Sequence, residues 1–260
     1  FPAAGIAGAA IASSVSEAVS LLFFIIYTSM TADKRKYGFR RAFTLRPHLL
    51  KGMLSISGWT MVQSFISVSI WFIFFLAIEH LGERPLAVTN IVRNISALLI
   101  MVISAFATTA GALISNQIGA GEQRCLFKTC GMTLKLTYAI LIPLLIILCL
   151  FPEPVLRAFT DSPSLIAASV NSVYVMASST LIMAPSFILF NAVSGTGNTR
   201  AGFIMEMISL AVYTAVIYYG IIRLKPDVAL CWFSEHVYGV TLIFLAWWYL
   251  KSGKWRGKKV

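Results

Sequence analysis

The sequence predicts an all-α integral membrane protein, a helical bundle of about seven transmembrane helices. The 260 residues are 58% hydrophobic and only 12% charged, with a mean hydropathy of +0.82, whereas soluble domains carry about 25% charged residues. Apolar windows of roughly 20 or more residues recur along the chain, and each can satisfy its backbone hydrogen bonds as a helix in hydrocarbon. The loops between these windows alternate in their content of Lys and Arg.

After the long polar loop 31–52, the predicted helices follow one another through short polar connections. Pro85 stands where the third helix can begin, and Gly119 and Gly121 stand where it can end. Pro185 lies near the middle of the fifth helix, where it removes a backbone donor. The resulting bend is a candidate hinge, and the alternative is a bend that packing holds fixed. The windows are residues 4–29, 53–78, 86–116, 132–151, 165–192, 202–222 and 228–250.

The basic residues predict the topology. Most of the 21 Lys and Arg residues lie in the loop 31–52, in the third and fifth loops, and in the tail 251–260. Short loops rich in Lys and Arg remain cytoplasmic, so we expect these loops and the C-terminus on the cytoplasmic side of a multi-pass protein of the cell (inner) membrane. The lipid bilayer, with its anionic headgroups, is then the expected partner of this charge. Nucleic-acid binding is not expected.

Polar side chains inside the apolar windows mark the candidate site, because exposing them to lipid is unfavourable. Several of them recur at helical spacing and therefore share a helix face. Such faces could line a cavity for an aromatic, weakly polar solute, or they could only join helices through hydrogen bonds. Arg93 could also extend to the outer headgroups. The candidate substrate-cavity residues are Trp59, Gln63, Ser67, Asn90, Arg93, Asn94, Tyr174 and Ser178.

Three acids within the windows are candidate proton or cation sites. Glu17 lies near the middle of the first window. Glu206 lies about two turns inside the cytoplasmic end of the sixth helix, and Glu235 about two turns inside the outer end of the seventh. For Glu206 and Glu235 the alternative is a merely structural carboxylate, partly hydrated near an interface.

Catalytic and metal chemistry are not predicted. His48, His80 and His236 fall at different ends of the predicted bundle, and neither HExxH nor GxSxG occurs. The four cysteines form no CxxC pair, so we expect no metal site and no cofactor. A polytopic membrane enzyme, which would gather such residues at one membrane depth, is kept as an alternative of another class.

Three segments resemble the multidrug and toxic compound extrusion (MATE) transporters. The first is the Gly-rich pattern within residues 5–19, the second is "NQIGAG" at residues 116–121, and the third is "GTGNT" at residues 195–199. The resemblance implies four parts. Residues 1–30 would be the last helix of the N-terminal lobe, 31–52 a basic cytoplasmic inter-lobe loop, 53–250 the six-helix C-terminal lobe of a twelve-helix transporter, and 251–260 a basic cytoplasmic tail.

The resemblance also implies a function and partners. Members of this family are secondary-active antiporters that export small organic, often cationic, compounds in exchange for Na⁺ or H⁺. The partner would be the missing N-terminal lobe of the same protein. Some members carry essential acids at places comparable to Gln63 and to residues 183–185, which are not acidic here. The coupling ion is therefore expected in the missing lobe. A lipid-linked saccharide flippase of the same superfamily is the alternative.

The glycine-rich stretch at residues 195–199 is predicted to be a turn between two helices. Gly195 and Gly197 would permit a sharp reversal of the chain. Asn198 and Thr199 would cap the helix that follows.

Overall fold

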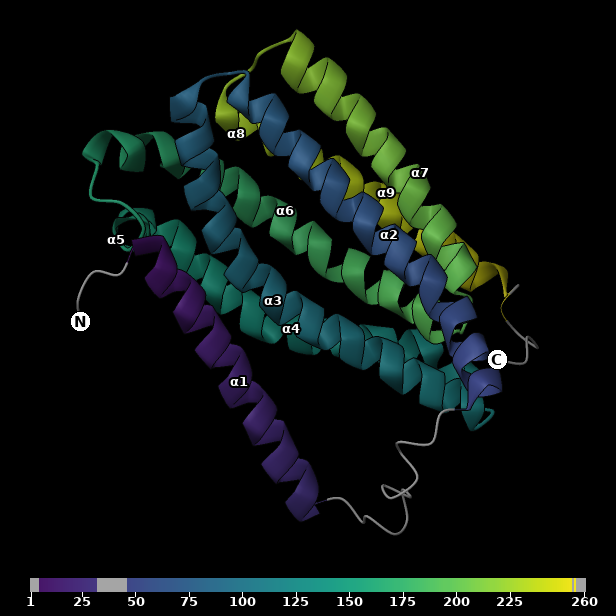
Figure 1. Cartoon of the computed structure of the whole chain (residues 1–260). Helices are drawn as coiled ribbons and strands as arrows, with labels where there is room; N and C mark the ends of the chain where they lie inside the picture. Colours follow the sequence, from purple (N-terminus) through teal and green to yellow (C-terminus); the bar gives the residue numbers. More distant parts are fainter. Residues whose placement is uncertain (1–4, 32–45, 254, 256–260) are drawn as a thin grey trace. The chain divides into compact units, whose positions relative to one another are not determined.

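The computed structural model describes residues 5–31, 46–253 and 255, and within these the chain is helical without any strand (Figure 1). Seven of the helices are long and apolar enough to cross a membrane, which confirms the predicted all-α class. The elements are α1 (Gly5–Thr31), α2 (Pro47–Glu79), α3 (Glu83–Gly119), the 3₁₀ turn Gln123–Cys125, α4 (Leu126–Leu150), α5 (Pro152–Arg157), α6 (Pro163–Gly195), α7 (Thr199–Val216), the π-helix Ile217–Arg223, α8 (Val228–Cys231) and α9 (Ser234–Ser252).

The helix ends differ from the predicted windows because polar residues extend several helices beyond their apolar stretches. α2 begins at Pro47 although residues 47–52 were assigned to the inter-lobe loop, and α4 begins at Leu126 instead of 132. The connection after α4 contains the short helix α5, which starts with Pro152 at a position where proline is favoured. Residues 32–45, 254 and 256–260 of the predicted loop and tail lie outside the described residues.

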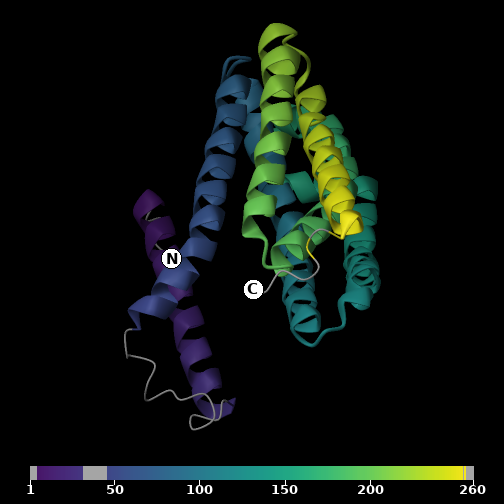
Figure 2. The same ribbon diagram turned by 90° about the vertical axis from the view of Figure 1, so that its right-hand side faces the viewer.

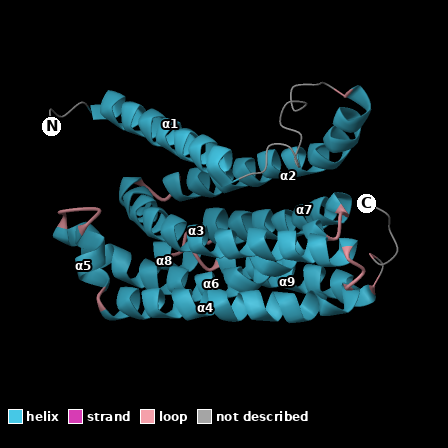
Figure 3. Cartoon of the chain, turned by 90° about the horizontal axis from the view of Figure 1, so that it is seen from below, coloured by secondary structure: helices cyan, strands magenta, loops and turns pink. Residues whose placement is uncertain are grey.

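The chain forms two units, residues 1–53 and residues 54–260. Within the first unit, α1 carries Glu17 with its side chain exposed. Within the second unit, α6 packs against α3, α4 and α9, and α7 packs against α9. Figure 2 shows α7 in green beside α9 in yellow, and Figure 3 shows the short connections between these helices.

Glycines allow α3 and α6 to approach closely. A Cβ atom added at Gly195 would lie 2.5 Å from the carbonyl oxygen of Gly111, and one added at Gly111 would lie 2.9 Å from the carbonyl oxygen of Asn191. Small residues at such contacts let helix backbones meet in membranes, where packing rather than the hydrophobic effect drives association. Gly195 is therefore needed for helix packing, which differs from the role in chain reversal that the sequence predicted.

The turn between α6 and α7 confirms the predictions for Gly197 and Asn198, whereas Thr199 is the first residue of α7 and not its cap. Gly197 has φ +77°, a conformation that residues with a Cβ seldom adopt. The Asn198 side chain accepts a hydrogen bond from the Ala201 amide at 3.2 Å and so caps α7. Its amide nitrogen also donates to the Tyr249 hydroxyl of α9 at 2.6 Å, which ties this turn to the last helix.

Candidate functional site

A cavity of about 150 Å³ lies between helices of the second unit. Its walls are mostly apolar and aromatic, and no Lys, Arg or His is among the described residues that line it. The lining comes from α2 (Ser67, Trp71), α3 (Ile100), α6 (Met183, Phe187), α7 (Glu206, Leu210, Tyr213) and α9 (Glu235, Tyr238). The cavity therefore combines two carboxylates with three aromatic residues that carry a hydrogen-bonding group.

Glu206 is held by hydroxyl groups from two other helices. Its side chain is 4% exposed. The Ser67 hydroxyl of α2 donates to Oε1 at 2.8 Å, and the Tyr238 hydroxyl of α9 lies 2.9 Å from Oε1 and 3.1 Å from Oε2. Hydrogen bonds to a carboxylate are stronger than those between neutral groups, so Glu206 links α2, α7 and α9 at one point.

Glu235 of α9 also accepts a hydrogen bond from a tyrosine, which here lies on α7. Its side chain is 9% exposed, and the Tyr213 hydroxyl of α7 donates to Oε1 at 2.7 Å. The rings of Tyr213 and Tyr238 pack edge to face with their centroids 5.8 Å apart. The two carboxylates and the two tyrosines thus form one connected cluster. The burial of both acids favours the site interpretation over partly hydrated structural carboxylates.

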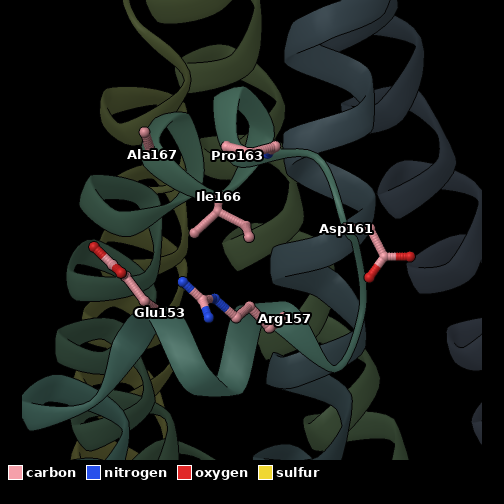
Figure 4. Close-up of a pocket in the computed structure, with 6 residues that line it drawn as sticks. All are labelled: Glu153, Arg157, Asp161, Pro163, Ile166 and Ala167. Carbon is pink, nitrogen blue, oxygen red and sulfur yellow. The ribbon is translucent and has the colours of Figure 1, made fainter.

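A larger hollow of about 430 Å³ lies at α5 and the loop that follows it. In Figure 4, Arg157 extends toward Glu153 and Ile166, whereas the Asp161 carboxylate points away from them. These three charged side chains are exposed. The smaller cavity is the stronger candidate because its polar groups are buried and converge on one space.

The structure brings only some of the predicted residues to this cavity. Ser67, Glu206 and Glu235 line it. Trp59 precedes Ser67 on α2, and its ring lies 5.2 Å from that of Phe203 on α7. Gln63, which follows Trp59 by four residues on the same helix, is half-buried. Their role in a substrate cavity stays a prediction.

The three residues of the predicted face on the third helix have different surroundings. Asn90 donates to the Leu86 carbonyl of its own helix at 3.1 Å, and Asn94 is exposed. The Arg93 guanidinium lies 5.3 Å from the centre of the Phe75 ring on α2, and its buried Nε has no hydrogen-bond partner. A cation over an aromatic face is attracted to it, so Arg93 joins α3 to α2.

The remaining predicted residues lie on α6. Tyr174 is 43% exposed. Ser178 is also exposed and lies 2.9 Å from His236 Nε2 on α9. Pro185 is partly buried within α6, which is assigned as one helix through it. Its role as a hinge stays a prediction, as does a cation at Glu17, which belongs to the other unit.

Tyr213 and Tyr238 are site residues that the sequence reasoning missed, whereas Trp71 belongs to the α2 face that was predicted to line a cavity. Tyr213 follows Glu206 by seven residues and Tyr238 follows Glu235 by three, so each tyrosine shares a helix face with an acid. Trp71 continues the four-residue spacing of Trp59, Gln63 and Ser67. This spacing was the available signal.

Solved structures with the same fold are membrane transporters. The chain is similar to the Vibrio cholerae MATE transporter VcmN in its bent form, with a TM-score of 0.72 and 16% identity over 80% of this chain and 48% of that one. It is also similar to a MOP superfamily transporter from Pyrococcus furiosus, with a TM-score of 0.68 and 14% identity over 76% of this chain and 44% of that one.

Two curated relatives agree with this likeness. A probable multidrug resistance protein NorM of Thermotoga maritima is 24% identical over 100% of this chain and 56% of its own length. An uncharacterized transporter YisQ of Bacillus subtilis is 23% identical over 81% of this chain and 46% of its own length. The chain thus spans about half the length of the curated relatives it matches. The MatE family model matches residues 60–219, which is more than half of the chain, and this multi-pass membrane protein therefore belongs to the MatE family.

Proposed function

We propose that this chain forms one lobe of a secondary-active, cation-coupled exporter of small organic compounds in the cell (inner) membrane, with its C-terminus in the cytoplasm. The observation that carries the proposal is the pair Glu206 and Glu235, buried in one cavity that has no basic residue among its described lining. Intramembrane acids of this kind mark ion or substrate pathways.

The chemistry of the cavity supports a cationic or neutral aromatic compound as the substrate. Trp71, Tyr213 and Tyr238 offer ring faces that attract organic cations, and the carboxylates add negative charge. An anionic lipid-linked saccharide would be repelled by the same groups, so the cavity favours the exporter over the flippase. The second lobe of the full-length protein would close the cavity and complete the path.

The described lobe also offers a place for the coupling ion. Glu206 and Glu235 supply carboxylate oxygens with hydroxyl partners inside the membrane span. We therefore place the coupling site in this lobe, where the sequence had favoured the N-terminal one.

Efflux by the full-length protein tests the proposal. Cells that lack their own exporters would be loaded with tetraphenylphosphonium, and its loss would be followed under sodium and proton gradients. Glu206→Gln and Glu235→Gln should each lower efflux by about 10-fold or more, because intramembrane carboxylates are functional groups. The matched control is Glu122→Gln, which changes an exposed acid in the turn after α3. Equal efflux by all three variants would contradict the proposal.

A further inference from the structure

The two buried acids are paired crosswise between the antiparallel helices α7 and α9. Glu206 of α7 accepts from Tyr238 of α9, whereas Glu235 of α9 accepts from Tyr213 of α7. The tyrosine rings contact each other between these two hydrogen bonds. Each helix therefore contributes one acid and one tyrosine, and the four side chains form two hydrogen-bonded pairs that line the same cavity of about 150 Å³.

The two acids lie at different depths in the membrane span. Glu206 is seven residues from Thr199, where its span begins, which is about 10 Å along a helix at 1.5 Å per residue. Glu235 is seven residues from Val228, at the other end of the bundle, which is again about 10 Å where the chain is helical. Glu206 is thus nearer to the end with the turns at Gly121 and Gly197, and Glu235 is nearer to the opposite end.

A second, smaller cavity continues from Glu235. It has a volume of about 30 Å³ and shares Trp71, Ile100, Met183 and Glu235 with the larger cavity. A cavity of roughly 10–15 Å³ suffices for one water if polar partners are present. Here the partners are Glu235, the hydroxyl groups of Ser96, Ser179 and Thr180, and the indole N–H of Trp232, which is buried without a hydrogen-bond partner.

The unpartnered Trp232 N–H identifies the chemistry of this small site. An indole N–H can only donate, and leaving it buried without an acceptor is unfavourable. A metal cation would be repelled by it, whereas a water molecule can accept from Trp232 and donate to Glu235. The small cavity therefore suits a water that hydrogen-bonds to the carboxylate.

We propose that Glu206 and Glu235 are two successive stations of one proton path through this lobe, with Glu206 exchanging protons with the end that carries Gly197 and Glu235 exchanging with the opposite end through the small cavity. This inference rests on the proposed function and names its coupling ion. A proton removes a buried negative charge that no basic residue of the described lining offsets.

The transfer between the stations uses the Tyr238 hydroxyl and one water molecule in the larger cavity as carriers, and both are regenerated. When Glu206 is protonated and the Tyr238 hydroxyl turns toward a water in the larger cavity, the Glu206 proton passes to the Tyr238 oxygen and Tyr238 releases its own hydroxyl proton to that water. That water passes a proton to Glu235. Tyr238 ends neutral, Glu206 ends as a carboxylate and Glu235 ends protonated, so one proton has moved from one station to the other.

The titratable groups that face this path all belong to α7 and α9. They are Glu206, Tyr213, Glu235 and Tyr238, with His236 adjacent to Glu235 in the chain. The described lining from α2, α3 and α6 consists of Ser, Thr, Trp, Ile, Met and Phe side chains.

The test separates proton movement from substrate movement in proteoliposomes that contain the full-length protein. Uptake of labelled tetraphenylphosphonium would be driven either by an acidic lumen or by a sodium-loaded lumen. Exchange of labelled for unlabelled tetraphenylphosphonium at equal pH needs no net proton movement. Glu206→Gln and Glu235→Gln should each reduce acid-driven uptake by roughly 100-fold more than they reduce exchange, within the range found for lost proton-transfer groups. Glu122→Gln should change neither.

The outcomes distinguish this inference from the proposed function. If neither gradient drives uptake by the wild-type protein and no exchange occurs, the proposed function is wrong. Uptake that follows sodium and ignores pH would overturn the proton path and leave the exporter standing. If Glu235→Gln behaves like Glu122→Gln while Glu206→Gln is inactive, Glu206 alone exchanges the proton and the two-station path is overturned. If a Gln variant fails to exchange, Tyr238→Phe provides the test, because it keeps both acids and removes only the hydroxyl between them. Unchanged acid-driven uptake by Tyr238→Phe would overturn the path. Loss of acid-driven uptake with exchange retained would support the path.

Discussion

The substitution Gly195→Ala should destabilise the bundle at the contact between α3 and α6. The new Cβ would lie 2.5 Å from the Gly111 carbonyl oxygen and 3.2 Å from the Gly111 carbonyl carbon and Cα. Ordinary van der Waals contact begins near 3.4 Å. All three neighbours are backbone atoms within a long helix, so the clash can be relieved only by moving α6 away from α3.

The magnitude follows from two opposing effects. Overpacking a well-packed interior costs about 1–3 kcal/mol. Replacing glycine by alanine stabilises a helix interior by at most about 1 kcal/mol. The gain is smaller at Gly195 because this is the last residue of α6. We expect a net loss of roughly 1–2 kcal/mol, and each kcal/mol lowers the Tm of a domain of 150–250 residues by about 2–4 °C.

Thermal unfolding in detergent, followed by tryptophan fluorescence, measures this effect. Gly131→Ala is the matched control, because Gly131 lies within α4 and a Cβ there would meet nothing within 4 Å. That variant should be as stable as the wild type or slightly more stable, since only the helix propensity changes. A Tm for Gly195→Ala equal to that of Gly131→Ala would refute the close-contact argument.

Three further substitutions or labels test other parts of the lobe. Asn198→Ala removes the cap of α7 and should lower the free energy of unfolding by about 1 kcal/mol, which chemical denaturation or a Tm shift would reveal. Ser67→Ala removes one donor to Glu206, a hydrogen bond worth about 1.5–3 kcal/mol when the acceptor is charged, and should lower tetraphenylphosphonium efflux, whereas Ser69→Ala, which loses only a bond to its own helix, should not. Cys125 adjoins the turn after α3 and is only partly buried; if that turn is cytoplasmic, a membrane-impermeant maleimide should label it in opened cells and leave it unlabelled in intact ones.

The sequence was sufficient for the number of long helices but not for their ends. Apolar windows locate the part of a helix that lies in hydrocarbon. They cannot locate polar turns that continue the same helix, and for this reason residues 47–52 and 126–131 were assigned to loops although they are helical. The turn at Gly197 and Asn198 was predictable because its conformation and its capping bond depend on neighbouring residues only.

The site was only partly predictable because it depends on which helices are neighbours. Spacing shows that Glu206 shares a face with Tyr213, and that Glu235 shares a face with Tyr238. It does not show that these two faces meet, which is the fact that pairs each acid with the tyrosine of the other helix. The same limit applies to Gly195, whose role depends on Gly111, a residue far away in the sequence.

Substitutions at the two kinds of contact in this lobe should affect stability and transport separately. α3 and α6 meet chiefly through backbone atoms of Gly111, Asn191 and Gly195, a contact without a titratable group. The middle of α2 is joined to α7 by side chains, through the bond from Ser67 to Glu206. Gly195→Ala should therefore lower the Tm while the ratio of acid-driven uptake to exchange stays at its wild-type value. Glu206→Gln retains shape and hydrogen-bonding capacity, so it should change that ratio by far more than it changes the Tm. If both variants moved both quantities in proportion, the transport defect of Glu206→Gln would reflect misfolding, and the assignment of Glu206 to the ion path would lose its support.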